Sequence, residues 1–174
     1  MSINDWKFAL VVLAAVLAGA TARADGSGDP AIASSDNGKY ADKGGNPTYK
    51  VSEDGTVDWY TFSGFRRYHS DCHVCHGPNG EGSSYAPALA NSLKTMSYVD
   101  FNNIVTNGRN HVDAANDKVM PAFATNANVM CYLDDIYVYL RARANDAIPG
   151  GRPPKHEDKS QADKDAEASC TGIK

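Results

Sequence analysis

Hydrophobic residues recur with helical spacing towards the end of this 174-residue chain. In residues 128–144, four apolar residues are separated by four, three and four positions: Val129, Leu133, Ile136 and Leu140. Because an α-helix has 3.6 residues per turn, these side chains share one face. The spacing predicts a helix with one apolar face, which the Pro149-Gly150-Gly151 run ends.

Weaker patterns predict three further helices before this one. Two cover residues 59–71 and, more briefly, residues 88–94. The third begins at Ser97, since Ser97 and Asp100 have the S-x-x-D form of a capping box, and Gly108 is a natural stop. The expected fold class is therefore all-α, with about three to five helices and long loops.

Polar segments flank the helical region. A small hairpin around Asp54-Gly55 is expected near the start of a domain that spans residues 49–149. Residues 25–48 contain few bulky apolar side chains and predict a flexible leader, and the charged residues 150–174 predict a disordered tail. A domain of this size has a limited core of its own, so a buried cofactor would contribute much of the apolar surface.

The N-terminus has the form of a cleaved signal peptide over residues 1–24. Residues 8–20 form an apolar run that is too short for a comfortable membrane span, and Ala22-Arg23-Ala24 is an A-x-A cleavage site. The alternative is an uncleaved membrane anchor. Export through such a peptide predicts a periplasmic protein that is not stably inserted in the membrane.

The charge balance excludes some classes of partner. The chain has 17 basic and 21 acidic residues, and removal of residues 1–24 leaves a net charge of about −5. A mildly acidic protein is a poor candidate for binding nucleic acid or anionic lipid. We expect no nucleic-acid partner and no stable membrane contact.

The strongest chemical signal is Cys72-His73-Val74-Cys75-His76. Two cysteines three positions apart, followed directly by histidine, are the attachment motif of a covalent haem c. Each thiol can add to one haem vinyl group, and His76 then becomes an axial iron ligand. Half of a zinc site and a thioredoxin-type pair are the alternatives. No second ligand pair with suitable spacing follows, and the region does not resemble a βαβ unit.

The second axial ligand must come from a residue far along the chain. Met120 is the favoured candidate, because it lies in the stretch 110–127 between two predicted helices and precedes Pro121-Ala122-Phe123. The alternatives are Met96, Met130, His111, His69 and His73. A thioether ligand stabilises ferrous iron and fills the coordination site, which favours electron transfer over catalysis.

Cys131 and Cys170 remain after the haem motif is assigned. In an oxidising compartment two remaining cysteines most simply form a disulfide. Cys131 lies two residues from both Val129 and Leu133, so it points away from the apolar face and is accessible to the tail. The bridge would fasten the tail to the last helix; two free thiols or an intermolecular link are the alternatives.

Taken with these motifs, the sequence resembles the class I c-type cytochromes over about residues 59–143. Gly64-x3-Tyr68-x3-Cys72 is similar to that family's N-terminal helix, and Val138-Tyr139-Leu140 to its C-terminal helix at the crossing of the two. Ala86-Pro87-Ala88-Leu89 resembles the family's proline segment. The resemblance implies that the carbonyl of Pro87 orients the ring of His76.

A narrower resemblance concerns residues 58–96 and the presence of four cysteines. These are similar to the periplasmic cytochrome c-553i type of methylotrophic bacteria, which is associated with quinoprotein (PQQ-dependent) alcohol dehydrogenases. The resemblance implies a monomeric one-electron carrier, not an enzyme. It would accept electrons from a quinoprotein alcohol or methanol dehydrogenase, or a related C1-oxidation pathway, and pass them to another cytochrome or a terminal oxidase.

Two other functions remain open from the sequence. The protein could be a haem subunit of a larger redox complex. It could also be a ligand-binding haem enzyme or sensor, if Met120 does not ligate iron. Arg66-Arg67 could form part of a docking patch, although a solvated helix face is the simpler interpretation.

Overall fold

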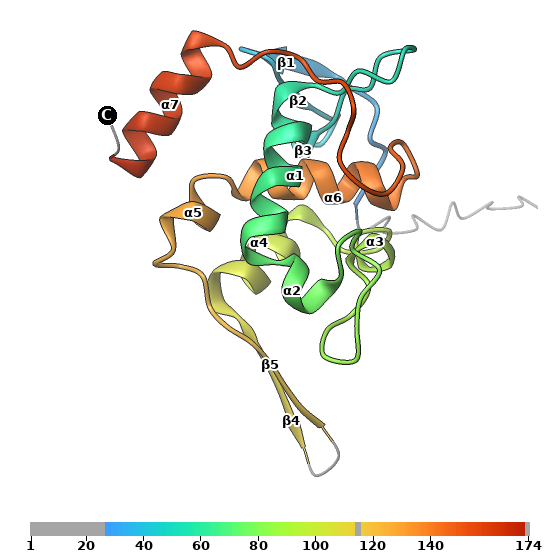
Figure 1. Ribbon diagram of the computed structural model, residues 1–174, viewed down its shortest axis with the longest axis vertical. Coiled ribbons are helices and arrows are strands. Elements are labelled where there is room, and N and C mark those ends of the chain that lie inside the picture. Colours follow the sequence, from blue (N-terminus) through green and yellow to red (C-terminus); the bar gives the residue numbers. More distant parts are fainter. Residues whose placement is uncertain (1–26, 114–115, 173–174) are drawn as a thin grey trace, which may run out of the picture.

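The computed structural model describes residues 27–113 and 116–172, and Figure 1 shows their arrangement. The predicted signal peptide and its cleavage site lie outside these residues. The elements follow in this order: β1 (Ser34–Asp36), β2 (Lys39–Ala41), β3 (Pro47–Thr48), α1 (Trp59–Asp71), α2 (His73–His76), α3 (Leu89–Ser92), α4 (Tyr98–Asn107), β4 (Arg109–Asp113), β5 (Asn116–Met120), α5 (Ala127–Met130), α6 (Leu133–Ala144) and α7 (Gln161–Thr171).

The crossing of α1 and α6 is the centre of the molecule (Figure 1). The backbones approach closely at Gly64, where an added β-carbon would stand 1.9 Å from the carbonyl oxygen of Asp135. One turn later the rings of Tyr68 and Tyr139 pack together, with centroids 5.4 Å apart. A glycine followed by an aromatic residue at the crossing is the arrangement that the family resemblance implies.

α6 is buried on nearly every side. The predicted apolar face is buried throughout, at Leu133, Ile136 and Leu140 of α6 and at Val129 of the preceding α5. Tyr137 adds a further contact to α4, since its ring lies 4.9 Å from Tyr98 and 5.2 Å from Phe101 between centroids. Because the helix is covered all round, its sequence has apolar residues on every side and not along one stripe alone.

The predicted helix boundaries agree closely with the structure, except that one predicted helix is divided into two. Asp58 caps α1 by accepting a hydrogen bond from the backbone N–H of Thr61, and Ser97 caps α4 through the N–H of Asp100. The helix expected over residues 128–144 is two helices, α5 and α6, with a break at Cys131 and Tyr132. The break directs Cys131 towards the C-terminal segment.

The segment after Gly108 was expected to be a loop, and it is a hairpin. β4 and β5 pair antiparallel, with Arg109 opposite Met120, and the hairpin extends from the body of the domain (Figure 1). The side chains of residues 111–117, including that of the alternative ligand His111, lie outside the described part of the chain.

The prediction of a flexible leader over residues 25–48 is wrong for residues 27–48, which the structure describes. β1, β2 and β3 form an antiparallel sheet, with Ser35 opposite Tyr40 and Tyr40 opposite Thr48. The polar composition suggested disorder because these residues bring no apolar core of their own. Their partner is instead a charged residue of α6.

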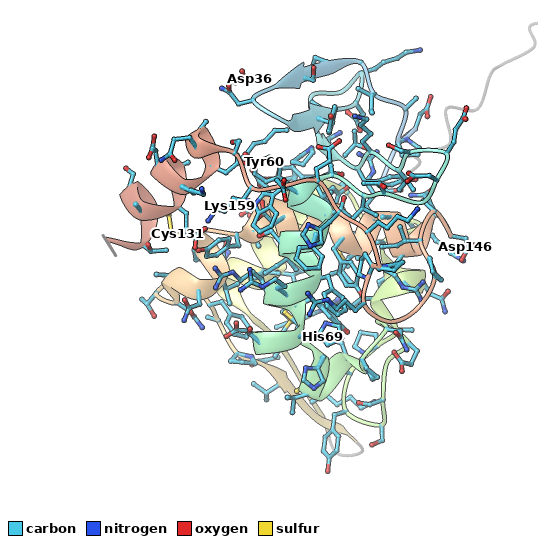
Figure 2. All side chains as sticks on the ribbon, turned by 45° about the horizontal axis from the view of Figure 1, so that its top comes forward. Asp36, Tyr60, His69, Cys131, Asp146 and Lys159 are labelled. Atoms are coloured by element: carbon cyan, nitrogen blue, oxygen red, sulfur yellow. A yellow bond between two sulfur atoms is a disulfide. The ribbon has the colours of Figure 1, made fainter. Side chains whose placement is uncertain are left out.

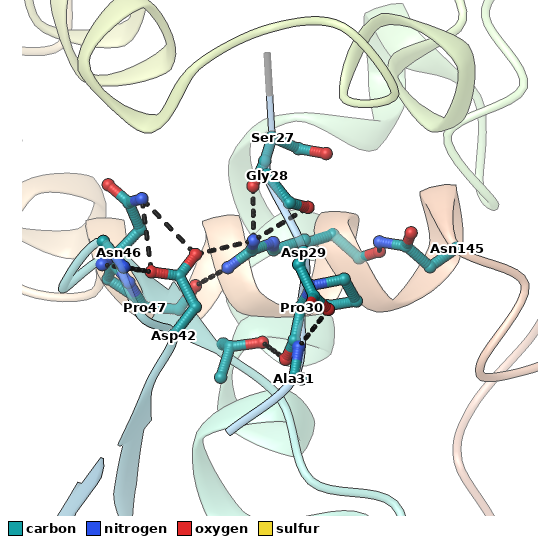
Figure 3. Close-up of polar contacts among 12 residues, drawn as sticks. Ser27, Gly28, Asp29, Pro30, Ala31, Asp42, Asn46, Pro47 and Asn145 are labelled. Carbon is teal, nitrogen blue, oxygen red and sulfur yellow. Dashed lines mark hydrogen bonds and ion pairs between the residues drawn. The ribbon is translucent and has the colours of Figure 1, made fainter. Parts of the chain in front are cut away.

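That partner is Arg141, which is fully buried. Figure 3 shows the network of polar contacts that includes Asp42, Asn46 and Ser27. Its guanidinium pairs with Asp42 at 2.8 Å and donates to the carbonyl oxygens of Pro47, at 2.9 Å, and Ser27. Burial acts to raise the pKa of Asp42, but hydrogen bonds from Arg141 and Asn46 outweigh it and hold the pKa below its usual value. One buried cation thus binds the sheet to α6.

The expected disordered tail is also ordered over its described residues. Residues 152–160 run back along α1, where His156 stacks on Phe62 with centroids 3.7 Å apart. α7 then begins with a capping box between Ser160 and Asp163. Cys131 and Cys170 are joined by a disulfide, with Cα atoms 5.8 Å apart (Figure 2).

Side chains of α1 also hold α7, in addition to the disulfide. The hydroxyl of Tyr60 donates to Asp163, and Arg67 pairs with Glu167 at 3.3 Å. Arg67 also lies over the ring of Tyr132, 3.5 Å from its centroid. Arg67 therefore fastens the C-terminal segment, and of the two arginines only Arg66 remains for the docking patch considered from the sequence.

None of the helices in the described residues combines the length and the apolar character needed to cross a membrane.

Candidate functional site

The cysteine–histidine motif occupies the junction of α1 and α2. The backbone N–H of Cys72 bonds to the carbonyl of Tyr68 at 2.9 Å, which continues α1 into the motif. The N–H groups of Cys75 and His76 both bond to the carbonyl of Cys72, at 3.2 and 3.1 Å. This single turn places both thiols and the His76 ring on one short, rigid segment.

Both thiols of the motif are unpaired, in contrast to the bridged Cys131 and Cys170. Cys75 is exposed, whereas Cys72 is partly buried. Burial, with smaller effects from Asp71 and Cys75, raises the pKa of the Cys72 thiol to about 12. A thioredoxin-type pair needs a lowered thiol pKa, so this environment counts against that alternative.

The ring of His76 is buried and fixed in orientation. Its Nδ1 lies 2.9 Å from the carbonyl oxygen of Pro87. A carbonyl can only accept a hydrogen bond, so Nδ1 carries the proton and the lone pair of Nε2 is free for a metal. Metal-binding histidines are commonly oriented in this way by a backbone carbonyl.

The loop that carries Pro87 is folded tightly against the motif. Gly82 donates its N–H to the carbonyl of His76 at 2.8 Å and has φ +86°. A β-carbon at Gly82 would stand 2.6 Å from the amide nitrogen of Ala88 and 2.9 Å from the carbonyl carbon of Pro87. Only glycine allows this approach, which sets the Pro87 carbonyl against the ring.

Met120 ends β5 where the hairpin rejoins the domain. A β-carbon at Gly108 would stand 2.6 Å from the carbonyl oxygen of Met120, so the two ends of the hairpin lie in close contact. Just beyond Met120, the N–H of Phe123 bonds to the carbonyl of Val105 at 3.0 Å. The segment that holds Met120 is therefore attached to α4 by backbone hydrogen bonds.

Burial alone does not select the methionine ligand. Met96, Met120 and Met130 are all partly buried and pack against the same core cluster. Met130 belongs to α5, and Met96 precedes the cap of α4. Met120 differs from both because it is the last residue of an extended strand, β5. The remaining histidine candidates, His69 and His73, are on the α1–α2 segment itself, and each bonds to the backbone carbonyl four residues earlier.

Apolar side chains around the motif face outward. Val74 and Tyr85 are each 77% exposed and Val119 is 59% exposed, which places three large exposed hydrophobic residues in the motif, the proline loop and the hairpin. A cofactor or a partner protein bound at the motif would cover apolar surface of this kind.

The donor set fits one covalent haem c better than a zinc ion. No group of three or more His, Cys, Asp or Glu side chains suited to a metal ion occurs in residues 27–113 and 116–172, as a structural zinc site would need. Two unpaired thiols three positions apart, an imidazole with its Nε2 free, and a thioether on a separate segment are the groups that haem attachment and ligation use.

Sequence reasoning missed the long-range interactions behind the site. The buried Arg141 was not singled out, although an arginine inside the apolar run Tyr137–Ala142 is an available signal. The steric requirement at Gly82 also escaped notice. Its only signal is a glycine shortly after the motif, which by itself is weak.

Comparisons with known proteins agree with the geometry. Residues 62–140 match the family model described as cytochrome c oxidase, cbb3-type, subunit III. Cytochrome c-553I of Paracoccus denitrificans is 56% identical over 135 residues, which is 78% of this chain and 60% of that protein's length. Cytochrome c-555 of Methylococcus capsulatus is 39% identical over 100 residues, which is 57% of this chain and 75% of that protein.

A solved structure is also similar. The crystal structure of the c-type cytochrome XoxG from Methylobacterium extorquens AM1 is 52% identical and superposes with a TM-score of 0.74. The superposition covers 80% of this chain and 85% of that one. The fold of this chain is therefore one already observed in a crystal.

Proposed function

We propose that this chain, which belongs to the c-type cytochromes and carries covalent haem c, works as a mono-haem one-electron carrier. The sequence contains one C-x-x-C-H motif, so one haem is attached. In this proposal Cys72 and Cys75 form the thioether bonds, and His76 and Met120 are the axial ligands of the iron. The bound haem supplies the one-electron Fe(II)/Fe(III) couple.

The observation that carries the proposal is the contact between His76 and Pro87. The hydrogen bond from Nδ1 to the Pro87 carbonyl holds the buried ring in one tautomer and one orientation, without any contribution from a metal ion. A rigid ligand keeps the coordination similar in both oxidation states, which suits electron transfer. The packing of Gly82 against Pro87 and Ala88 supports the same interpretation.

For the electron donor we propose a quinoprotein (PQQ-dependent) alcohol or methanol dehydrogenase, and for the acceptor another cytochrome or a terminal oxidase. The support is the likeness to cytochrome c-553I and to the c-type cytochrome XoxG. Encounters between such partners are brief and use small interfaces. The exposed Val74 and Tyr85 offer apolar contact area beside the motif.

The periplasm is the compartment that this proposal requires. The predicted signal peptide would direct export, and haem attachment of this type takes place outside the bacterial cytoplasm. The disulfide between Cys131 and Cys170 supports an oxidising compartment.

The experiment that tests the ligand assignment is the far-red absorption of the ferric protein, where a methionine ligand produces a weak charge-transfer band. We expect the band in the wild type and its loss in Met120→Ala. Met96→Ala and Met130→Ala are matched controls, because both methionines also pack against the core. A wild type without the band would contradict Met120 ligation, and carbon monoxide binding would then test the enzyme or sensor alternative.

The donor is tested by mixing ferric protein with a substrate-loaded PQQ alcohol dehydrogenase. We expect fast reduction that slows as salt is added, because charged side chains steer the encounter. Reduction no faster than that of an unrelated c-type cytochrome would contradict the proposed donor and leave the carrier function intact.

A further inference from the structure

Two histidines outside the proposed haem ligands form a pair beside the motif. His69 lies in the last turn of α1, and His73 is the first residue of α2. They are four residues apart along nearly continuous helix, so both project from the same side. Their ring centroids lie 5.3 Å apart and their planes differ by 28°. Figure 2 shows His69 on α1.

Both rings are held in the same tautomer. Nδ1 of His69 lies 2.9 Å from the carbonyl oxygen of Phe65, and Nδ1 of His73 lies 2.6 Å from that of His69. Since a carbonyl only accepts, each Nδ1 carries the proton and each Nε2 presents a lone pair. Within the described residues neither Nε2 has a hydrogen-bond partner.

The surroundings restrict the rings further. His69 packs on Phe65, with centroids 4.1 Å apart, and its edge meets Tyr68 at 5.5 Å. Both histidine side chains are partly buried, not fully exposed. Less rotational freedom is therefore lost when a ligand is bound than for two histidines on an open surface.

We propose that His69 and His73 form a binding site for a divalent transition-metal cation of the Zn²⁺ class. Two imidazoles bound to one ion at about 2.1 Å with a tetrahedral angle have ring centroids about 5 Å apart, which matches the observed pair. Histidines at i and i+4 on a helix are a recurrent metal-binding arrangement, and imidazole nitrogen suits zinc, copper and nickel.

The site is open on its remaining sides. The described residues contain no group of three or more His, Cys, Asp or Glu side chains suited to a metal. Water therefore completes the coordination, and binding is reversible, unlike that of a structural zinc ion.

The position of the pair has a consequence that depends on the proposed function. His73 directly follows Cys72, one of the two residues proposed to hold the haem. A cation there favours the ferrous state, which carries one positive charge fewer than the ferric state. Occupation of the site therefore raises the reduction potential.

The test is a calorimetric titration of haem-loaded, untagged ferric protein with Zn²⁺, which does not exchange electrons with the protein. The loaded protein is essential, because free thiols at Cys72 and Cys75 would compete for the ion. We expect one ion bound per chain. His69→Gln and His73→Gln should each lower the affinity at least about tenfold, since even the loss of an outer-shell partner has effects of this size.

His156→Gln is the matched control, because the His156 ring stacks on Phe62 and its Nδ1 bonds to the carbonyl of Glu157, apart from the pair. It should bind Zn²⁺ as the wild type does. Unchanged binding in both His69→Gln and His73→Gln, or an equal loss in His156→Gln, would overturn the site.

The reduction potential, measured with and without Zn²⁺, tests the consequence separately. We expect a positive shift in the wild type and none in His73→Gln. Binding without a shift would overturn the electrostatic coupling but keep the site. Loss of the proposed Met120 ligation would appear in the far-red band, whereas the titration would still report zinc binding.

Discussion

Arg141 and Asp42 form an ion pair in which both side chains are buried, with 2.8 Å between the guanidinium nitrogen and the carboxylate oxygen. The pair joins segments that are 99 residues apart in the sequence. Asp42 belongs to the turn before β3, and Arg141 to α6. The same guanidinium donates to the carbonyl oxygens of Pro47, Ser27 and Gly28. The polar N-terminal segment is thereby part of the domain.

Replacing Arg141 by methionine should destabilise the protein strongly. The variant leaves the buried carboxylate of Asp42 without its cation and several carbonyls without the donor they now have, which costs about 3–5 kcal/mol. Urea unfolding followed by circular dichroism measures the change. Lys155→Met is the matched control, because its ion pair with Asp54 is exposed and its loss should leave unfolding nearly unchanged.

The double variant Arg141→Met with Asp42→Leu should recover part of the lost stability, since it removes both charges together. If Arg141→Met unfolds at the same urea concentration as the wild type, the ion pair does not hold the sheet in place.

Asp135 should make stability depend on pH in an unusual direction. Its carboxyl is buried at the α1–α6 crossing and accepts a hydrogen bond from Ser63 at 2.6 Å. Burial raises its pKa to about 7 from 3.8, and the bond from Ser63 opposes this only in part. The folded state then binds the proton more tightly, so stability is greatest below pH 4 and falls as the pH rises through 7.

The full contribution corresponds to about 4 kcal/mol between these limits. Asp135→Asn keeps the size of the side chain and cannot ionise, so its stability should vary less between pH 5 and pH 8. Thermal unfolding at several pH values provides the measurement. Asp146→Asn, in an exposed loop, should keep the wild-type profile; an unchanged profile in Asp135→Asn would disprove this account.

Gly82→Ala should disturb the orientation of His76. The new β-carbon would meet the Pro87–Ala88 peptide at less than 3 Å, and the backbone at Gly82 already has φ +86°. We expect a shifted reduction potential as well as lower stability. Gly55→Ala separates the two effects, because φ is +82° there but nothing lies within 4 Å. That control should lose stability through strain alone, with the potential unchanged.

Breaking the disulfide should release the C-terminal segment without altering the haem ligands. Replacing both Cys131 and Cys170 by serine removes a chain-entropy constraint of about 4 kcal/mol. Tyr60 and Arg67 still hold α7, so the observed loss should be smaller. We expect faster proteolysis within residues 152–160 and an unchanged far-red band; a lost band would mean that the tail supports the iron site.

The features that the sequence could predict depend on residues that are close together along the chain. The spacing of Cys72, Cys75 and His76 predicts thioether attachment and an axial ligand without reference to distant parts of the chain. The period of Val129, Leu133, Ile136 and Leu140 predicted a face that is indeed buried. Capping at Ser97 depends on two residues three positions apart, so it too is visible in the sequence.

The sequence by itself thus determined the haem motif, the main helices and the two cysteines left to pair. Only the tertiary structure decided that residues 27–48 and 152–172 belong to the folded domain, and that Gly82 must let Pro87 approach His76. These features depend on contacts between distant segments, such as Arg141 with Asp42 and Arg67 with Glu167. A polar segment resembles a disordered one until the partner that neutralises its charges and accepts its hydrogen bonds is known.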